Sequence, residues 1–366
     1  MKLDKTSRLL TTFEQGHRLD SVFFEYGEAF LDAQSSIVRT IQIDRYGGPE
    51  VLIRRELPVP SPGPEEVLIR IAYSGVNFMD IHTREGKYAG SRTYPQTLPT
   101  TLGIEGAGTI EGVGSRVDGF RVGDRVAYCL SWGSYADYAA VAAWRVVHVP
   151  EALPLERAAA SMFHGLTAHY LAHDVGKLGP GVTCLVHAAS GGIGQLLVQI
   201  GAQLGATVYA TTSTEAKAQV ARDQGAKAAF LYDDGRFADI VRALTGGRGV
   251  DVVFDPVGQP TLRDSLRATR TRGLIVSFGS VGGNVTDLNP IELGEAGSLF
   301  LTRPRLADHL TDANTVRHRA ADIFDALIAG TLSIGIAGRF SLDNVEQAHQ
   351  NLEHRKTVGK PLIKIA

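Results

Sequence analysis

The feature that most constrains this chain of 366 residues is a glycine-rich turn, Ala189-Ser-Gly-Gly-Ile-Gly194, set between two periodic segments. Before it, residues 182–187 form a short apolar run, typical of a strand buried on both faces. After it, apolar residues recur at helical spacing over 193–204, and a second strand-like run covers 206–211. Strand, glycine turn, helix and strand make a βαβ unit, the context in which this pattern predicts dinucleotide binding.

Each glycine of the turn has a distinct expected role. Gly191 lets the backbone approach a pyrophosphate, and Gly194 lets the helix pack close to the preceding strand. The free N–H groups at the start of the helix then face the phosphates. The alternative is a tight turn of any parallel sheet, without a cofactor. The turn residues expected to contact the cofactor are Ser190, Gly191, Gly192, Ile193 and Gly194.

The end of the second strand distinguishes between the two nicotinamide cofactors. A site for NAD usually ends this strand with an acid that accepts from the ribose 2′-OH, but residues 210–213 contain none. Ser213 and Lys217 instead supply a hydroxyl and a positive charge, which fit a 2′-phosphate. Alternatively, Lys217 is a solvated helix residue, and Ser213 or Thr214 is a helix cap. The missing acid favours NADPH.

Composition and charge exclude several classes of protein. With 44% hydrophobic and 21% charged residues, the chain has the composition of an ordinary globular protein. A net charge of −2 gives no basic footprint for nucleic acid, and no apolar run reaches the length of a membrane span. Only Cys129 and Cys184 occur, which excludes a disulfide framework and predicts a reducing, cytoplasmic location.

The order of the elements predicts two domains. Glycine- and valine-rich strands fill residues 38–149, and a helix with a break at His164-Gly165 follows over 153–172. Alternating strands and helices then continue to 278, as in a doubly wound α/β domain, before the tail adds further elements. The active site is expected in the cleft between the domains. The predicted divisions are an N-terminal extension (1–37), a β-rich catalytic domain (38–164 and 305–366) and a cofactor domain (165–304).

Several dispersed segments together resemble one known family. The segments are Gly75-Val-Asn-Phe-Met-Asp80, Leu98-Pro-Thr-Thr-Leu-Gly-Ile-Glu-Gly-Ala-Gly108, Gly123-Asp-Arg-Val126, 188–194, Asp255-Pro-Val-Gly258, Ser277-Phe-Gly279 and Thr357-Val-Gly-Lys360. The chain from Val38 onward resembles the zinc-independent, zeta-crystallin-like quinone oxidoreductases of the medium-chain dehydrogenase/reductase superfamily. The resemblance implies a Rossmann cofactor domain inserted in a GroES-like catalytic domain, and an NADPH-binding homodimer that pairs through the cofactor domain at Gly258–Val285.

The resemblance also argues against a metal. Zinc-dependent relatives place a Cys after the Gly-Val pair and a His between Gly and Glu, where this chain has Asn77 and Ile104. A structural lobe of four cysteines is impossible in a chain that has two. Zinc sites need thiolate or imidazole ligands. We therefore expect no metal.

Three catalytic residues follow from the family's cleft positions: Asn77, Asp80 and Tyr88. Asn77 can donate an amide hydrogen to a carbonyl or to the nicotinamide, and Tyr88 can donate to a developing oxyanion. Alternatively, Asn77 caps a turn and Asp80 caps the helix that contains His82 and Arg84; for Asp80 the cap is favoured. His82 replaces a frequent tyrosine and His164 a frequent lysine, and both changes alter the polarity near the cleft.

Further cofactor contacts are implied position by position. Thr167 is expected near the nicotinamide, Lys217 and Tyr232 at the 2′-phosphate, and Lys360 near the phosphates. Phe278 and Ser280 are expected at the ribose and nicotinamide, with Leu301 and Arg303 where the chain recrosses the cleft. The alternatives are core packing for Phe278 and a solvated surface lysine for Lys360.

The function predicted from these residues is an NADPH-dependent reductase that transfers hydride to a quinone or another conjugated carbonyl compound without zinc. Its alternatives are an NADPH-dependent 2-alkenal, enone or enoyl-thioester reductase, and a crystallin-like protein that binds NADPH without turnover. Residues 1–36 precede the family-like sequence, and nothing in them is needed to complete a sheet or the cleft. They are expected to be a loosely attached extension, or alternatively a short amphipathic helix over Phe23–Leu31.

Overall fold

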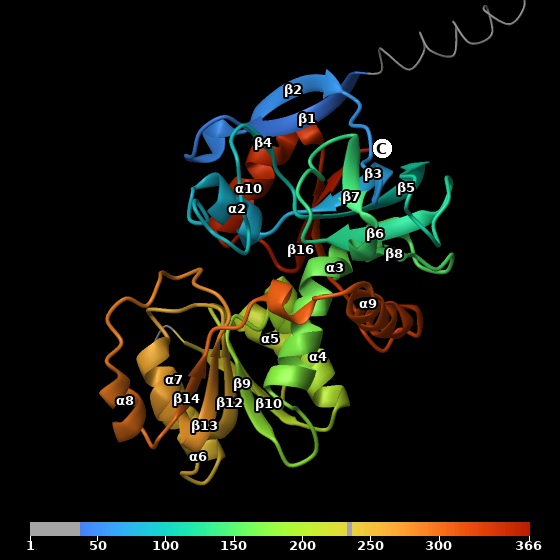
Figure 1. The fold of residues 1–366 in the computed structure, drawn as a ribbon. Coiled ribbons are helices and arrows are strands. Elements are labelled where there is room, and N and C mark those ends of the chain that lie inside the picture. The colour runs from blue at the N-terminus through green and yellow to red at the C-terminus, as the bar shows by residue number, and fades with distance from the viewer. Residues whose placement is uncertain (1–36, 233–235) are drawn as a thin grey trace, which may run out of the picture.

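The fold was analysed in a computed structural model, which describes residues 37–232 and 236–366. The predicted extension over residues 1–36 lies outside the described residues. Figure 1 shows a β-rich part that contains β1–β8 and a second part built on β9–β14, with α3 and α9 at their junction.

The bounds of the elements are as follows. The strands are β1 (Ile37–Ile43), β2 (Ile53–Pro58), β3 (Glu66–Gly75), β4 (Thr100–Thr101), β5 (Glu105–Val113), β6 (Arg125–Cys129), β7 (Tyr138–Ala142), β8 (Val146–His148), β9 (Thr183–Val186), β10 (Thr207–Thr212), β11 (Ala228–Leu231), β12 (Val250–Asp255), β13 (Thr269–Ser277), β14 (Phe300–Thr302), β15 (Ile336–Phe340) and β16 (Lys360–Lys364). The α-helices are α2 (Phe78–Arg84), α3 (Leu155–Tyr170), α4 (Gly192–Gln203), α5 (Glu215–Asp223), α6 (Phe237–Leu244), α7 (Leu262–Ala268), α8 (Pro290–Glu295), α9 (Ala313–Ile328) and α10 (Val345–Glu353).

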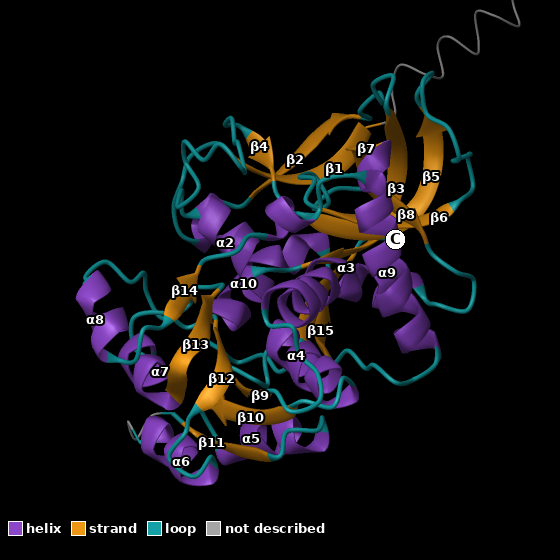
Figure 2. Cartoon of the chain, turned by 60° about the horizontal axis from the view of Figure 1, so that its bottom comes forward, coloured by secondary structure: helices purple, strands orange, loops and turns teal. Residues whose placement is uncertain are grey.

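The second part is a parallel sheet with strand order β11-β10-β9-β12-β13-β14. Its central strands β9, β10 and β12 are buried on both faces, as the apolar runs predict. Cys184 and Val186 of β9 pack on the face covered by α4, whereas Leu185 packs on the face covered by Phe237 of α6. Figure 2 shows helices on both sides of this sheet. The strand order reverses between β9 and β12, which is where such sheets bind ligands at the carboxyl ends of their strands.

The β-rich part contains a mixed sheet of order β15-β16-β3-β5-β6-β8, to which β7 adds by pairing with β3, and a small sheet of order β2-β1-β4. The last strand, β16, runs antiparallel to β3, with Leu362 opposite Gly75 and Lys364 opposite Tyr73. The chain therefore leaves this part after α3, builds the parallel sheet, and returns to complete the first sheet. This confirms the predicted fold class, a doubly wound α/β domain inserted in a β-rich, GroES-like one.

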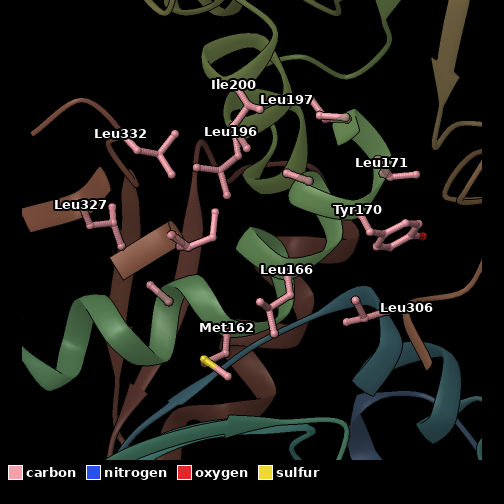
Figure 3. Close-up of a cluster of buried hydrophobic side chains, with 14 of the residues drawn as sticks. Met162, Leu166, Tyr170, Leu171, Leu196, Leu197, Ile200, Leu306, Leu327 and Leu332 are labelled. Carbon is pink, nitrogen blue, oxygen red and sulfur yellow. The ribbon is translucent and has the colours of Figure 1, made fainter. Parts of the chain in front are cut away.

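Helix α3 joins the two parts, and one expectation about it was wrong. No break occurs at His164-Gly165, because α3 is continuous over Leu155–Tyr170 and continues as a π-helical turn over Leu171–Val175. Gly165 packs closely against α9, since a Cβ there would lie 3.0 Å from Cγ2 of Ile323. Figure 3 shows Leu166 of α3 in the cluster of apolar side chains that fills this junction.

The sequence also predicts that no segment spans a membrane. Among residues 37–232 and 236–366, no helix is both long enough and apolar enough to span a membrane.

Candidate functional site

A cavity of about 400 Å³ lies at the carboxyl edge of the parallel sheet and extends beneath α2 and α3. It is lined by the segments that follow β9, β10, β11, β12, β13 and β14, together with residues of both helices and of the chain before β16. Most of the predicted site residues are brought together here. They are Asn77, Tyr88, Thr167, Ser190, Gly191, Gly192, Ile193, Gly194, Ser213, Lys217, Tyr232, Phe278, Ser280 and Arg303.

The glycine turn forms the wall of the cavity at the start of α4. The amide of Gly191 donates to Ala188 O at 2.9 Å, and the first bond of the helix runs from Gln195 N to Gly191 O, also 2.9 Å. The amides between these two bonds are the free N-terminal donors of the helix. A Cβ at Gly194 would collide with the carbonyl of Ala188, so only glycine lets α4 start this close to β9. The turn therefore has the shape and donors that a pyrophosphate needs.

The charges around the cavity fit a polyanionic cofactor. Its basic lining residues are Lys217, Arg303, Arg305 and Arg355, and no Asp or Glu belongs to the lining among the described residues. At the end of β10, Lys217 Nζ donates to Ser213 Oγ at 3.4 Å and to Arg355 O at 3.2 Å. These contacts hold the ammonium beside the two hydroxyl-bearing residues Ser213 and Tyr232. The group fits a phosphate better than a neutral ribose hydroxyl.

Two buried polar atoms that line the cavity from α3 have no partner among the described residues. They are Oγ1 of Thr167, whose side chain is almost fully buried, and Nδ1 of His164 one turn earlier. Buried polar atoms without a partner are uncommon in native proteins. His164 Nδ1 lies against Gly192, the first residue of α4.

At the other end, the cavity has a floor of buried polar groups. Asn77 precedes α2, its Nδ2 donates to Glu105 Oε1 at 2.9 Å, and its Oδ1 accepts from Lys360 Nζ at 2.5 Å. Glu105 Oε1 also forms an ion pair with the same ammonium, and neither charged side chain is exposed. The backbone places these groups together, because β3 lies between β5 and β16 in the sheet.

An aromatic wall stands beside this floor. The rings of Tyr88 and Tyr94 meet edge to face with centroids 5.5 Å apart, and the ring of His82 lies 6.2 Å from Tyr88. Burial lowers the pKa of His82 to about 4, which keeps the imidazole neutral at pH 7, and burial raises the pKa of Tyr88. The hydroxyl of Tyr88 therefore stays protonated and is able to donate a hydrogen bond.

Three predicted site residues lie outside the cavity lining. Asp80 is fully buried, and its Oδ2 accepts from Asn77 N at 2.8 Å, so it caps α2 and does not face a substrate. Leu301 is exposed because it lies on β14, the outer strand of the parallel sheet. Lys360 is fully buried, and its ammonium forms an ion pair with the carboxylate of Glu105, so its side chain is not solvated.

At the two positions where zinc-dependent relatives carry ligands, Asn77 bonds to Glu105 and Lys360, and Ile104 is a buried apolar residue. In the part of the chain that the structure describes, no group of three or more His, Cys, Asp or Glu side chains could hold a metal.

Sequence reasoning missed Glu105, which is buried outside the cavity lining, and several residues of the lining itself. Glu105 belongs to the Gly-Ile-Glu motif, but the motif does not predict that Glu105 forms an ion pair with Lys360, which lies 255 positions later. His164 was noticed only as a departure from a family pattern. Other cavity residues that were not predicted include Phe78, Tyr94, Phe163, Tyr170, Arg305, Arg355 and Thr357. Aromatic residues in a loop, such as Tyr94, carry no local signal of this kind.

Comparison with known proteins agrees with this geometry. Residues 63–151 match the alcohol dehydrogenase GroES-like domain, and residues 192–307 match the domain family described as zinc-binding dehydrogenase. The chain is 39% identical to a quinone oxidoreductase of Pseudomonas aeruginosa over 328 residues, which is 89% of this chain and 99% of that protein. It is 38% identical to a 2-haloacrylate reductase of a Burkholderia species, with coverage of 89% and 99%.

Solved structures give the same result. The quinone oxidoreductase of Escherichia coli, crystallised in complex with NADPH, superimposes with a TM-score of 0.86 at 35% identity, covering 89% of this chain and 99% of that one. The fold and the cavity define a medium-chain dehydrogenase/reductase. Within that class, the chain belongs to the quinone oxidoreductase family.

Proposed function

We propose that this protein is an NADPH-dependent oxidoreductase that transfers hydride to a quinone or a related conjugated carbonyl compound without zinc. The carrying observation is the cavity itself, which joins a dinucleotide turn, Lys217 and Arg355 at one end to a buried amide and an aromatic wall at the other. The E. coli relative, which was crystallised with NADPH, supports the choice of cofactor.

The basic end of the cavity supports the preference for NADPH over NADH. Lys217, held by Ser213 and by the carbonyl of Arg355, would bind the 2′-phosphate. The amides at the start of α4 would bind the pyrophosphate, and Thr167 would contact the nicotinamide end from α3. Arg303 donates from Nη1 to Ser277 O at 2.9 Å and thereby holds the loop that carries Phe278 and Ser280 against the cavity.

The polar residues at the other end support the reduction. NADPH, when bound, supplies the hydride. Negative charge then develops on the substrate oxygen, and the amide hydrogen of Asn77 and the hydroxyl of Tyr88 are the donors available to stabilise it. Tyr88 or a water molecule would supply the proton. The aromatic wall of Tyr88, Tyr94 and His82 gives a flat ring an apolar surface and excludes water.

The test is oxidation of NADPH with 1,4-benzoquinone, with 9,10-phenanthrenequinone and with a series of 2-alkenals. We expect turnover with the quinones. Tyr88→Phe should lower kcat and change KM little, because the ring remains and only the hydrogen-bond donor is lost. Tyr138→Phe, on strand β7 outside the cavity lining, is the matched control. NADPH binding without oxidation by any acceptor would instead support the non-catalytic, crystallin-like alternative.

A second candidate is reduction of a conjugated carbon–carbon double bond in an alkenal, enone or enoyl thioester. The similarity to a 2-haloacrylate reductase favours it, since that relative is as close in sequence as the quinone oxidoreductases. Higher kcat/KM for 2-alkenals than for both quinones would select this candidate.

We further propose a cytoplasmic homodimer that pairs through the cofactor domain over 165–304. Phe300, on the outer strand β14, is 59% exposed, which supports an interface at this edge. Cys129 and Cys184 are buried and unpaired, as expected of a protein in a reducing compartment. Light scattering should show a dimer, and Phe300→Asp should give a monomer while Val122→Asp, at an exposed site in the β-rich part, should not.

A further inference from the structure

The ammonium of Lys360 is an unusual feature of the cavity floor. It is fully buried, and three acceptors surround it: Glu105 Oε1 in an ion pair, Asn77 Oδ1 at 2.5 Å and His164 Nε2 at 3.4 Å. An ammonium has three hydrogens and no acceptor site, so these contacts match its capacity. Burial lowers the pKa of Lys360, and the adjacent carboxylate of Glu105 opposes that effect. One buried cation thus touches two polar side chains that line the cavity, Asn77 and His164.

The contact determines how the amide of Asn77 is oriented. Because the lysine can only donate, the atom that faces it must be the carbonyl oxygen Oδ1. Nδ2 then donates one hydrogen to Glu105 Oε1 at 2.9 Å. The buried carboxylate of Asp80 is a second hydrogen-bond partner of the Asn77 side chain. A flipped amide would place an N–H group against the ammonium and the oxygen against the carboxylate, so the pair of charges excludes it.

The same contact determines which nitrogen of His164 carries the proton. Nε2 faces the ammonium and must accept, so the hydrogen of the neutral ring lies on Nδ1. Burial, reinforced by the charge of Lys360, lowers the pKa of His164 well below its ordinary value and keeps the ring neutral. Nδ1 is buried without a partner among the described residues, and a Cβ at Gly192, the first residue of α4, would collide with it. An unsatisfied donor therefore lies directly against the dinucleotide turn.

We propose that Lys360 is a positioning residue that fixes the amide orientation of Asn77 and the tautomer of His164, and that His164 donates from Nδ1 to the bound dinucleotide. This inference rests on the proposed NADPH function. It gives His164 a role in binding the cofactor, in place of the lysine that is frequent at this position in the family. It also gives Lys360 a role through its neighbours, without contact to the phosphates.

The rival explanation is that the Lys360–Glu105 pair only joins β16 to the rest of the sheet. A purely structural pair would affect stability and would leave the tautomer of His164 and the binding of NADPH unchanged. The first measurement needs no variant of the lysine. In protein labelled with ¹⁵N-histidine, the His164 signals, assigned by their loss in His164→Phe, should show a protonated Nδ1 and an unprotonated Nε2. A protonated Nε2 in the wild-type protein would overturn the proposal.

The second measurement is the Kd of NADPH, obtained by fluorescence titration. His164→Phe and Lys360→Met should each raise Kd about tenfold, as expected for one hydrogen bond worth about 1.4 kcal/mol. The double variant should bind no more weakly than either single one, because both changes remove the same interaction. Lys364→Met, at an exposed position on the same strand, should bind like the wild type.

Lys360→Met leaves Glu105 buried without its partner and risks misfolding. The variant that combines Lys360→Met with Glu105→Gln has no buried unpaired charge. In this variant, His164 should no longer be held in the Nδ1-protonated form alone. Wild-type affinity in His164→Phe, or fully additive losses in the double variant, would refute the inference. A wild-type protein that does not bind NADPH would refute the proposed function instead, and the tautomer measurement would remain valid.

Discussion

Two glycines of the dinucleotide turn should separate binding from stability when each is replaced by alanine. The backbone of Gly191 has φ −75° and ψ 168°, a conformation that alanine adopts without strain. A Cβ there would have one neighbour within 4 Å, Ala188 O at 3.2 Å, and would project into the cavity lining. A Cβ at Gly194 would instead lie 2.8 Å from Ala189 Cα and would collide with the carbonyl of Ala188. All of these neighbours are backbone atoms, so no side chain can rotate away.

The magnitudes follow from these neighbours. For Gly191→Ala, a gain of about 0.4–1 kcal/mol from the stiffer unfolded chain roughly offsets the poorer helix cap, so the free energy of unfolding should change by less than about 1 kcal/mol. Its methyl group would occupy the space that the pyrophosphate approaches, and overpacking costs about 1–3 kcal/mol. The Kd of NADPH should therefore rise about 5- to 150-fold. Gly194→Ala should lose about 1–3 kcal/mol of stability for the same reason.

The assays are urea unfolding for stability and fluorescence titration for the Kd of NADPH. Gly119→Ala, in a surface turn with open space around its Cβ, controls for the general effect of replacing a glycine, although its positive φ adds some strain. If Gly191→Ala binds NADPH with wild-type affinity, the turn does not face the pyrophosphate. If Gly194→Ala unfolds at the wild-type urea concentration, the close approach of α4 to β9 does not require glycine.

Four further outcomes are expected. Lys217→Ala should weaken NADPH binding by about 1–3 kcal/mol and leave NADH nearly unchanged, and equal losses would contradict the assignment of the 2′-phosphate site. Activity should survive chelation, and elemental analysis should find no stoichiometric zinc; one tightly bound zinc per chain would overturn this. The urea concentration at the unfolding midpoint should decrease as the pH is lowered from 7 to 5. Five histidines have pKa values lowered chiefly by burial, so they would take up protons only on unfolding. Asp80, whose pKa burial raises to about 7, acts in the opposite direction. A flat midpoint would contradict it. Deleting residues 1–36 should leave turnover and NADPH affinity within about twofold, roughly 0.4 kcal/mol, since the cavity lining among the described residues begins at Val76; loss of activity would show the segment to be essential.

The parallel sheet was predictable because its signals are local. Strand runs such as 182–187 and 250–255 are mostly apolar, and helical spacing marks 193–204, so each element is specified by adjacent residues. The glycine turn is likewise a local pattern, which is why its residues were found. The errors arose where packing overrides a local signal. Gly165 suggested a helix break, yet α3 is continuous through this residue. The glycine instead lies at the contact with α9, where a Cβ would approach Cγ2 of Ile323 to 3.0 Å.

Short elements were missed for a related reason. Strand β14 has three residues and helix α8 has six, and neither is long enough to show a period. The position of β14 matters nonetheless, because it places Leu301 at the exposed edge of the sheet while Arg303, two residues later, reaches the cavity. The expectation that both would contact the cofactor treated neighbouring residues alike, but β14 ends at Thr302, and Arg303 belongs to the segment that follows it.

The cavity floor depends on contacts that no local pattern records. Lys360 follows Asn77 by 283 positions and meets it only because β16 pairs with β3 in antiparallel register. Once the strands are paired, the chemistry of the donors decides the rest. A buried ammonium can only donate, so it determines which atoms of Asn77 and His164 accept and which carry the hydrogens. Lys360→Gln would fill similar space with a group that both donates and accepts, and it would release both side chains to adopt either orientation. The polarity of the floor is therefore a property of one long-range contact.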